Sequence, residues 1–316
     1  MSGTIRVGLL FLFIVGFQLA TAAASAESEQ RAVLVTGASS GIGRAITEHL
    51  AANGFFVYAG ARKPEDLAAL DEIENVKSVR LDVTVQSDID NAVRMVTEGG
   101  RGLFGLVNNA GVAVLGEATK MTEKDLELTM NVNVYGPYRI TKAFAPLIIA
   151  SHGRITNIGS ISGILSGRTA TSYAMSKHAV ESYTDSLAAE MEEYGVAVSV
   201  VEPGNYQSRI RHKVVEVAKQ QGAPDERVEA LEQWRDTDYK EPDEVAEAVY
   251  SFMVSDSPKR RYMVVPNQTE AQITIQKIIE ETVQLNQDQP YSYDRDELVR
   301  MLDEALSSLN GNTGSD

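Results

Sequence analysis

The sequence has 316 residues, 43% hydrophobic and 23% charged, so it is long enough for a full buried core and too apolar for global disorder. Its 44 acidic and 29 basic residues give a net charge of −15, which disfavours binding to the phosphates of nucleic acid. The lack of cysteine excludes disulfides, thiolate catalysis and cysteine-ligated metals, and the four histidines lack metal-site spacing, so no metal is expected.

The first 26 residues differ from the rest of the chain. Arg6 precedes a mostly apolar run at residues 7–20, and small residues follow it, ending in Ala24-Ser25-Ala26. This pattern is typical of a secretory signal peptide, and the run is short for a membrane span of about 20 residues. We therefore expect a signal peptide or N-terminal anchor at 1–26, and an exported or membrane-associated protein. A start set too far upstream, or an anchor that leaves the remaining chain inside, would make it cytoplasmic.

From residue 31 onwards, short apolar segments alternate with helical patterns. Apolar, β-branched strands that alternate with helices indicate a doubly wound parallel sheet of the α/β class. Because no repeat or mid-chain linker is visible, we expect one domain at 27–266 and a helical C-terminal tail at 267–316. Strands are expected at 32–35, 55–61, 76–81, 105–107, 154–158, 196–201 and 261–265, and one long helix at 123–150.

Three glycines lie between the first strand and the first helix, in the pattern Thr-Gly-x-x-x-Gly-x-Gly. Gly37 permits a tight turn, Gly41 a close backbone approach, and Gly43 the packing of helix on strand. A dinucleotide pyrophosphate meets a helix N-terminus at such a turn. The alternative is a plain strand-to-helix connection.

The end of the second strand bears on the choice of cofactor. An NAD-preferring protein places a carboxylate there to bind the ribose 2′-hydroxyl, whereas this chain has Gly60-Ala61-Arg62-Lys63. Arg62 and Lys63 suit a 2′-phosphate, so NADP(H) is the expected cofactor and NAD the alternative. In that alternative Arg62 is a surface residue and the protein uses either cofactor.

Tyr173 and Lys177 are four residues apart, so on a helix they lie on one face. An ammonium beside a phenol lowers the pKa of the phenol, and such a tyrosine can exchange a proton with a substrate oxygen. Ser160, expected at the end of the preceding strand, would hydrogen-bond the same oxygen. By itself the Tyr-x-x-x-Lys spacing also occurs on ordinary helix surfaces.

Pro137 follows Asn133 by four residues and has no N–H to donate to its carbonyl. We expect Gly136-Pro137 to kink the helix, so that the freed carbonyl holds a water and links Lys177 to solvent as a proton path. The alternative is a kink that serves packing alone.

The charged segment at 208–234 is expected to be helical, either as a movable lid over a pocket or as a solvated excursion. Two helices are expected in the tail from residue 269, the second capped by Asp294 with Glu297 three residues later. The tail would cover the pocket or form a subunit interface.

Taken in order, these motifs resemble those of the short-chain dehydrogenase/reductase family over residues 31–265, with hydroxysteroid and retinol dehydrogenases as similar members. The resemblance implies a Rossmann-type fold, a homodimer or homotetramer, and the catalytic set Asn133, Ser160, Tyr173 and Lys177. It also implies that Asp82 and Val83 border the adenine, and that Ser208, where the family has threonine, meets the nicotinamide carboxamide. The expected cofactor-binding residues are Gly37, Ser39, Ser40, Gly41, Ile42, Gly43, Arg62, Asp82, Val83, Asn109, Ala110, Gly111, Tyr173, Lys177, Pro203, Gly204 and Ser208.

The resemblance implies an NADP(H)-dependent oxidoreductase that interconverts an alcohol and a carbonyl by hydride transfer, with Tyr173 as the acid/base. Its substrate would be a small apolar molecule, of retinoid or steroid type or another of medium size. Two alternatives stay open: a non-catalytic NAD(P)-binding sensor or structural protein, and an enzyme like the sugar-nucleotide epimerases or dehydratases. An exported enzyme would lack NADPH, so the expected export conflicts with the expected chemistry.

Overall fold

The computed structural model describes residues 30–220 and 222–311. The predicted signal peptide or anchor at 1–26 lies outside the described residues. Among the helices that the structure describes, none combines the length and the apolar character needed to cross a membrane.

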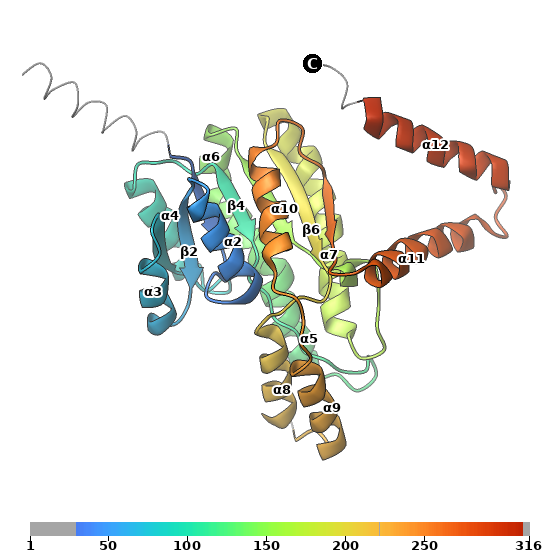
Figure 1. The fold of residues 1–316 in the computed structure, drawn as a ribbon, viewed down its shortest axis with the longest axis horizontal. Coiled ribbons are helices and arrows are strands. Elements are labelled where there is room, and N and C mark those ends of the chain that lie inside the picture. The colour runs from blue at the N-terminus through green and yellow to red at the C-terminus, as the bar shows by residue number, and fades with distance from the viewer. Residues whose placement is uncertain (1–29, 221, 312–316) are drawn as a thin grey trace, which may run out of the picture.

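Seven parallel strands of the described chain form one sheet in the order β3-β2-β1-β4-β5-β6-β7 (Figure 1). From β1 the chain adds β2 and β3 on one side, and it then crosses back to place β4 on the other side of β1. This reversal opens a crevice at the carboxyl ends of β1 and β4, where open α/β sheets bind ligands. The strands are β1 (Ala32–Val35), β2 (Phe56–Ala61), β3 (Val76–Arg80), β4 (Gly105–Asn108), β5 (Arg154–Ile158), β6 (Ala197–Pro203) and β7 (Arg261–Val264).

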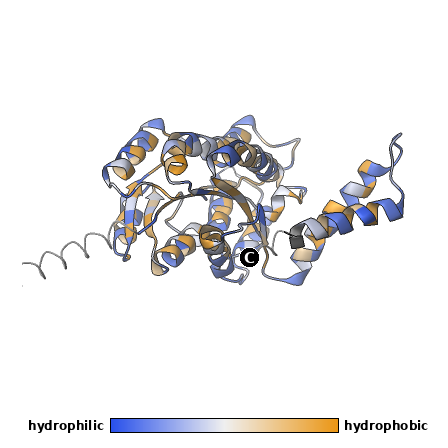
Figure 2. Cartoon of the chain, turned by 90° about the horizontal axis from the view of Figure 1, so that it is seen from above, coloured by the Kyte–Doolittle hydropathy of each residue, from blue (hydrophilic) through white to orange (hydrophobic). Residues whose placement is uncertain are grey.

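Figure 2 shows the sheet between two layers of helices. Successive residues of a strand face opposite layers. Ala32 and Leu34 pack with the layer of α4, α6 and α7, whereas Val33 and Val35 pack with the layer of α2, α3 and α10. Because both faces of the sheet are covered, β1 is apolar along its whole length, as predicted, whereas β3, β5 and β6 also carry polar residues. These helices are α2 (Gly41–Ala52), α3 (Pro64–Asp71), α4 (Gln86–Glu98), α6 (Gly136–Ala150), α7 (Thr171–Met191) and α10 (Asp243–Val254).

The single long helix expected at 123–150 is interrupted. Helix α5 (Glu123–Met130) is joined to α6 by a π-helical turn at Asn131–Tyr135. The turn ends two residues before Pro137, whose ring nitrogen cannot donate to the preceding helical turn. The sequence thus located the irregularity, but the structure accommodates it as a widened turn of the kind often found at functional sites.

The segment at 208–234 is helical, as predicted, and forms α8 (Ile210–Gln220) and α9 (Asp225–Arg235). The tail forms α11 (Gln268–Asn286) and α12 (Arg295–Gly311), which project from the body of the molecule (Figures 1 and 2). The predicted cap of α12 is confirmed, because the Asp294 N–H donates to the Glu297 carboxylate (2.9 Å) and the Glu297 N–H donates to the Asp294 carboxylate (2.8 Å).

Candidate active site

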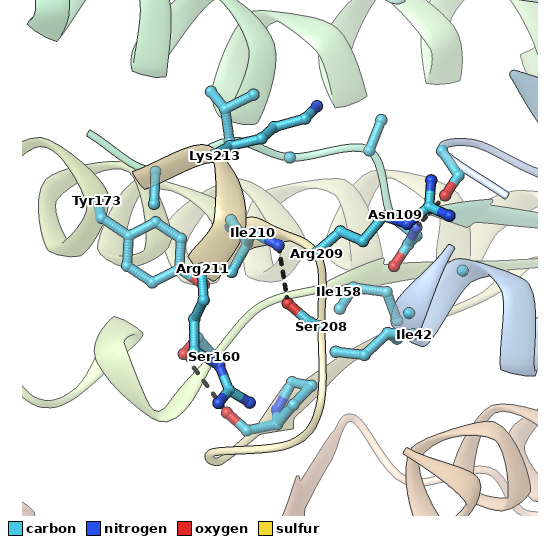
Figure 3. Close-up of a pocket in the computed structure, with 18 of the residues that line it drawn as sticks. Ile42, Asn109, Ile158, Ser160, Tyr173, Ser208, Arg209, Ile210, Arg211 and Lys213 are labelled. Atoms are coloured by element: carbon cyan, nitrogen blue, oxygen red, sulfur yellow. Dashed lines mark hydrogen bonds between the residues drawn. The ribbon is translucent and has the colours of Figure 1, made fainter. Parts of the chain in front are cut away.

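A cavity of about 600 Å³ lies at the carboxyl edge of the sheet. Its walls come from the segments that follow β1 to β6, together with α7 and α8, so residues far apart in the sequence share one space. Every residue predicted to bind the cofactor lines this cavity, and so do Ser160, Tyr173 and Lys177. Asn133 does not. Figure 3 shows Tyr173 and Ser160 toward one side of the view and Asn109 and Ile42 toward the other.

The glycine-rich turn is too closely packed for side chains. Gly37 has a φ of +66°, a conformation that disfavours residues with a Cβ. A Cβ on Gly43 would lie 2.3 Å from both the carbonyl oxygen of Gly37 and the amide nitrogen of Asn109. A Cβ on Gly41 would approach Ser208, which starts the segment that leads into α8, to 3.3 Å. The turn therefore presents bare backbone at the start of α2, which fits a pyrophosphate.

Asn109 braces this turn from the end of β4. Its amide nitrogen donates to the carbonyl oxygens of Thr36 (2.9 Å) and Gly37 (3.2 Å). The hydroxyl oxygen of Thr36 in return accepts hydrogen bonds from the backbone N–H groups of Asn109 and Ala110, both at 3.0 Å. The sequence predicted Asn109 to line the cleft, and the structure adds that it fixes the glycine-rich turn against β4.

At the end of β2, the structure brings a carboxylate to the basic pair. Asp82, which follows β3, lies 3.4 Å from Arg62 and accepts hydrogen bonds from the N–H (2.9 Å) and hydroxyl (2.7 Å) of Thr84. Burial alone would raise the pKa of Asp82, but the bonds from Thr84 and Arg62 outweigh it and lower the pKa. Arg62, at the end of β2, is thus oriented by the carboxylate of Asp82, which follows a different strand.

A third cation joins Arg62 and Lys63 from α8. Burial lowers the pKa of Lys213, and the nearby positive charges of Arg62 and Lys63 lower it further. In a chain with net charge −15, Arg62 and Lys213 from two distant segments thus both line the cavity, with the charge of Lys63 nearby.

Ser160, Tyr173 and Lys177 come together as predicted. Tyr173 and Lys177 lie one turn apart on α7, with the Lys177 nitrogen 5.6 Å from the centre of the Tyr173 ring. The Lys177 ammonium donates to the carbonyl oxygen of Ile158 at the end of β5 (2.7 Å). The Ser160 hydroxyl is hydrogen-bonded to Tyr173 and lies 3.4 Å from the carbonyl oxygen of Pro203. The constellation is held by the ends of β5 and β6 and by one face of α7.

The prediction that Lys177 lowers the pKa of Tyr173 is wrong, because the pKa of Tyr173 is raised in the fold. Burial raises the pKa of the phenol, and only the hydrogen bond with Ser160 opposes it. Burial also lowers the pKa of Lys177 from 10.5 to about 8, partly offset by the charge of Glu181. Desolvation disfavours both charged forms, and it outweighs the attraction between the ammonium and the phenolate that the spacing suggested.

Asn133 lies outside the cavity and connects its walls. Its side-chain oxygen accepts from the N–H of Val112, and its amide donates to the carbonyl of Val112 and the hydroxyl of Ser176, each at 2.9 Å. Ser176 in turn donates to the carbonyl of Tyr173 (2.7 Å). The side chain thus ties the π-helical turn to the loop after β4 and to α7. The predicted water-holding role of its main-chain carbonyl stays a prediction.

Helix α8 closes the cavity through a buried arginine that the sequence did not single out. Arg211 donates to the carbonyl of Tyr206 (2.6 Å), and its guanidinium carbon lies 3.6 Å from the centre of the Tyr239 ring. Tyr206 is itself buried and donates to the Glu244 carboxylate (2.5 Å). Arg211 lines the same cavity as Ser160 and Tyr173, and Figure 3 draws all three. The solvated-excursion alternative is therefore wrong for α8, while movement of a lid stays a prediction.

The tail contributes to the same site. Ile273 of α11 lines the cavity, and Glu270 accepts from the N–H of Asn205 (2.9 Å). A Cβ on Gly204 would lie 2.1 Å from the Glu270 carboxylate. The first turns of α11 therefore cover one edge of the cavity, in agreement with one of the two roles considered for the tail.

Residues 31–219 match the family model of the short chain dehydrogenases. The chain is 37% identical over 186 residues to the mitochondrial D-beta-hydroxybutyrate dehydrogenase of Bos taurus, covering 56% of this chain and 54% of that protein. It is 35% identical over 183 residues to retinol dehydrogenase 5 of Mus musculus, covering 56% of this chain and 57% of that protein. Its fold matches that of a serine dehydrogenase in its closed form with NADP+ at a TM-score of 0.65 and 27% identity, covering 74% of this chain and 94% of that one.

The chain belongs to the short-chain dehydrogenase/reductase family. It spans about half the length of the curated relatives described above.

Proposed function

We propose that this protein is an NADP(H)-dependent oxidoreductase that interconverts an alcohol and a carbonyl group by hydride transfer. The observation that carries the proposal is the meeting of Ser160, Tyr173 and Lys177 in the same cavity as the bare glycine-rich turn. A protein that only sensed or stored a dinucleotide would need the turn but not a tyrosine hydrogen-bonded to a serine. The family membership and the named activities of the relatives support the same reaction class.

The residues of the cavity fit a nicotinamide dinucleotide, because the glycine-rich turn lines it with backbone that carries no side chains at the start of α2. In this proposal the turn at residues 37–43 and the start of α2 hold the pyrophosphate, and Arg62 holds the 2′-phosphate. Asp82 and Val83 border the adenine, Lys177 holds a ribose, and Ser208 holds the carboxamide. When bound, the nicotinamide supplies or accepts the hydride.

The chain's own residues then handle the proton. In carbonyl reduction the Tyr173 hydroxyl donates its proton to the substrate oxygen, and in alcohol oxidation it takes the proton back. Ser160 hydrogen-bonds the same oxygen and orients it. Because burial raises the pKa of Tyr173, the phenol is protonated at neutral pH, which is the form needed for reduction. Lys177 titrates close to neutral pH and so sets the local charge beside the phenol.

The substrate side of the cavity favours a molecule of medium size and low polarity. Leu165, Ile210 and Trp234 line the cavity along with Tyr173. The guanidinium of Arg211 donates to the carbonyl of Tyr206 and lies against the ring of Tyr239, so protein groups already engage its charge. We therefore propose an apolar alcohol or carbonyl substrate, of the kind named in the retinol dehydrogenase relative.

The proposal is tested by following NADPH and NADH oxidation with a panel of aliphatic, aromatic, retinoid and steroid carbonyls. Turnover that is faster with NADPH and with the apolar members supports it. Cofactor binding measured by fluorescence, with no turnover on any carbonyl or on the corresponding alcohols, would replace it with the non-catalytic alternative.

The proposed cofactor preference predicts the effect of Arg62→Ser. Loss of a charge-assisted hydrogen bond to the 2′-phosphate costs about 1.5–3 kcal/mol, so the KM for NADPH should rise about 10- to 100-fold. The KM for NADH should stay within about threefold, because NADH has no 2′-phosphate. Steady-state kinetics with both cofactors measures the two values. Arg94→Ser, at an exposed arginine on α4, is the matched control. An unchanged KM for NADPH would show that Arg62 does not read the phosphate.

A further inference from the structure

Two buried carboxyl groups lie behind the catalytic lysine. Glu181 is on α7, one helical turn after Lys177, and its side chain is 12% exposed. Glu202, near the end of β6, is 3% exposed. Neither residue lines the cavity, so neither contacts a substrate or cofactor there. Side chains this deep are rarely acidic unless they are paired.

The pair lacks hydrogen-bond donors. Within the described chain, both carboxylate oxygens of Glu181 and one carboxylate oxygen of Glu202 lack a hydrogen-bond donor. Arg261 of β7 comes within 3.6 Å of Glu181 and 3.7 Å of Glu202, but its N–H groups point to Asp185, at 2.9 and 2.8 Å. Two ionised carboxylates in this position would repel each other and leave buried acceptors unsatisfied.

The pair is packed directly beneath the catalytic loop. A Cβ on Gly159 would lie 2.8 Å from a Glu181 oxygen, and one on Gly163 would lie 2.9 Å from it. These glycines flank Ser160, so backbone without side chains makes room for the Glu181 carboxyl group. The position of Glu181 is thus built into the segment that carries the catalytic serine.

We propose that Glu181 and Glu202 share one proton, and that the single negative charge of this pair acts as the counter-charge that keeps Lys177 protonated. The shared proton supplies the missing donor, because a carboxyl group donates to its carboxylate partner. This inference rests on the proposed function and adds two positioning residues to it, since both act through Lys177.

The charges around the pair are consistent with one retained proton. The groups that face Glu181 are Lys177 and Asp185 from α7, Glu202 from β6 and Arg261 from β7. Asp185 is already balanced by two hydrogen bonds from Arg261 and by Arg260 at 4.0 Å, so the negative charge that balances Lys177 comes from the pair. Burial and the charge of Glu202 raise the pKa of Glu181 to about 8, and burial raises that of Glu202.

The pair is tested with Glu181→Gln, Glu202→Gln and the double variant. Each single variant leaves one carboxylate with an amide donor and so keeps the single charge, and its pH profile of kcat/KM should stay close to wild type. The double variant removes the charge. The alkaline limb of its profile for carbonyl reduction should therefore move down by about one pH unit. At pH values above the limb kcat/KM should fall about tenfold, and at lower pH it should be unchanged. Glu190→Gln, at an exposed position on α7, is the matched control.

Two readouts do not depend on turnover. In ¹⁵N-lysine-labelled protein, NMR titration of Lys177, assigned with Lys177→Met, should give a lower midpoint in the double variant and not in the single ones. Infrared spectra at neutral pH should show the band of a protonated carboxyl group in wild type and Glu190→Gln, and its loss in each single Gln variant. Absence of the band from wild type, or an unshifted Lys177 midpoint in the double variant, overturns the inference. Absence of turnover with these signals present would overturn the proposed function alone.

Discussion

Replacement of Tyr173 by phenylalanine is expected to lower kcat/KM for carbonyl reduction by about a thousandfold, within the range of about 10² to 10⁴ for a general acid. The substitution removes one hydroxyl and keeps the ring, so the packing beside Lys177 should be preserved. Because the hydroxyl is the only group lost, binding of NADPH should change by less than about threefold. The expected result is a large loss in kcat at nearly constant cofactor affinity.

Steady-state kinetics and a fluorescence titration with NADPH measure these two quantities on the same preparation. Tyr183→Phe is the matched control, since it removes a hydroxyl from a partly buried tyrosine on the same helix, where the partner is Thr141. The control should retain its activity. Turnover above about a tenth of the wild-type rate in Tyr173→Phe would show that another group supplies the proton.

Much of the fold could be predicted because the signals are local. The strand β1 is a short apolar run, and the alternation of Ala32 and Leu34 with Val33 and Val35 between two helix layers explains why the whole run is apolar. Gly195, with a φ of +66°, ends the helical segment after α7, because glycine adopts this left-handed conformation readily. The π-helical turn could be located at Pro137 but not described, since its geometry depends on neighbours that α5 and α6 meet in space.

The site divides in the same way. The spacing of Tyr173 and Lys177 is a property of one helix, so their proximity could be predicted. The ion pair of Arg62 with Asp82 joins the ends of two strands, and only the parallel register of β2 and β3 brings them together. The pKa of Tyr173 depends on burial by the surrounding segments, which overrides the local charge of Lys177. Interactions between segments are what the sequence left undetermined.

Replacement of Lys177 by methionine is expected to have the second large effect on activity, a loss in kcat/KM of about a hundredfold or more. Methionine has a similar length and no charge, so it fills the space but supplies no counter-charge beside the phenol and no donor to the Ile158 carbonyl. Because Lys177 is also proposed to hold the ribose, the KM for the cofactor should rise together with the fall in kcat. That combined change separates Lys177→Met from Tyr173→Phe.

The same substitution predicts a difference in stability that depends on pH. The pKa of Lys177 falls from 10.5 in the ordinary state to about 8 in the fold, where the side chain is 7% exposed. Between these values the unfolded chain binds more protons than the folded chain, so the free energy of unfolding of wild type should rise with pH across this window. Relative to Lys177→Met, the gain should reach about 3 kcal/mol, at about 1.4 kcal/mol per pH unit.

Urea unfolding of both proteins between about pH 8 and 10.5 measures this difference, and the carboxyl groups near Lys177 largely cancel because both proteins contain them. Lys142→Met, at an exposed lysine on α6, should show no such slope. A flat difference between wild type and Lys177→Met would mean that the lysine is not desolvated in the fold. A difference that rises with pH would show that the fold holds an unfavourable buried ammonium at neutral pH. That ammonium lies at the position where the proposed proton transfer needs a positive charge.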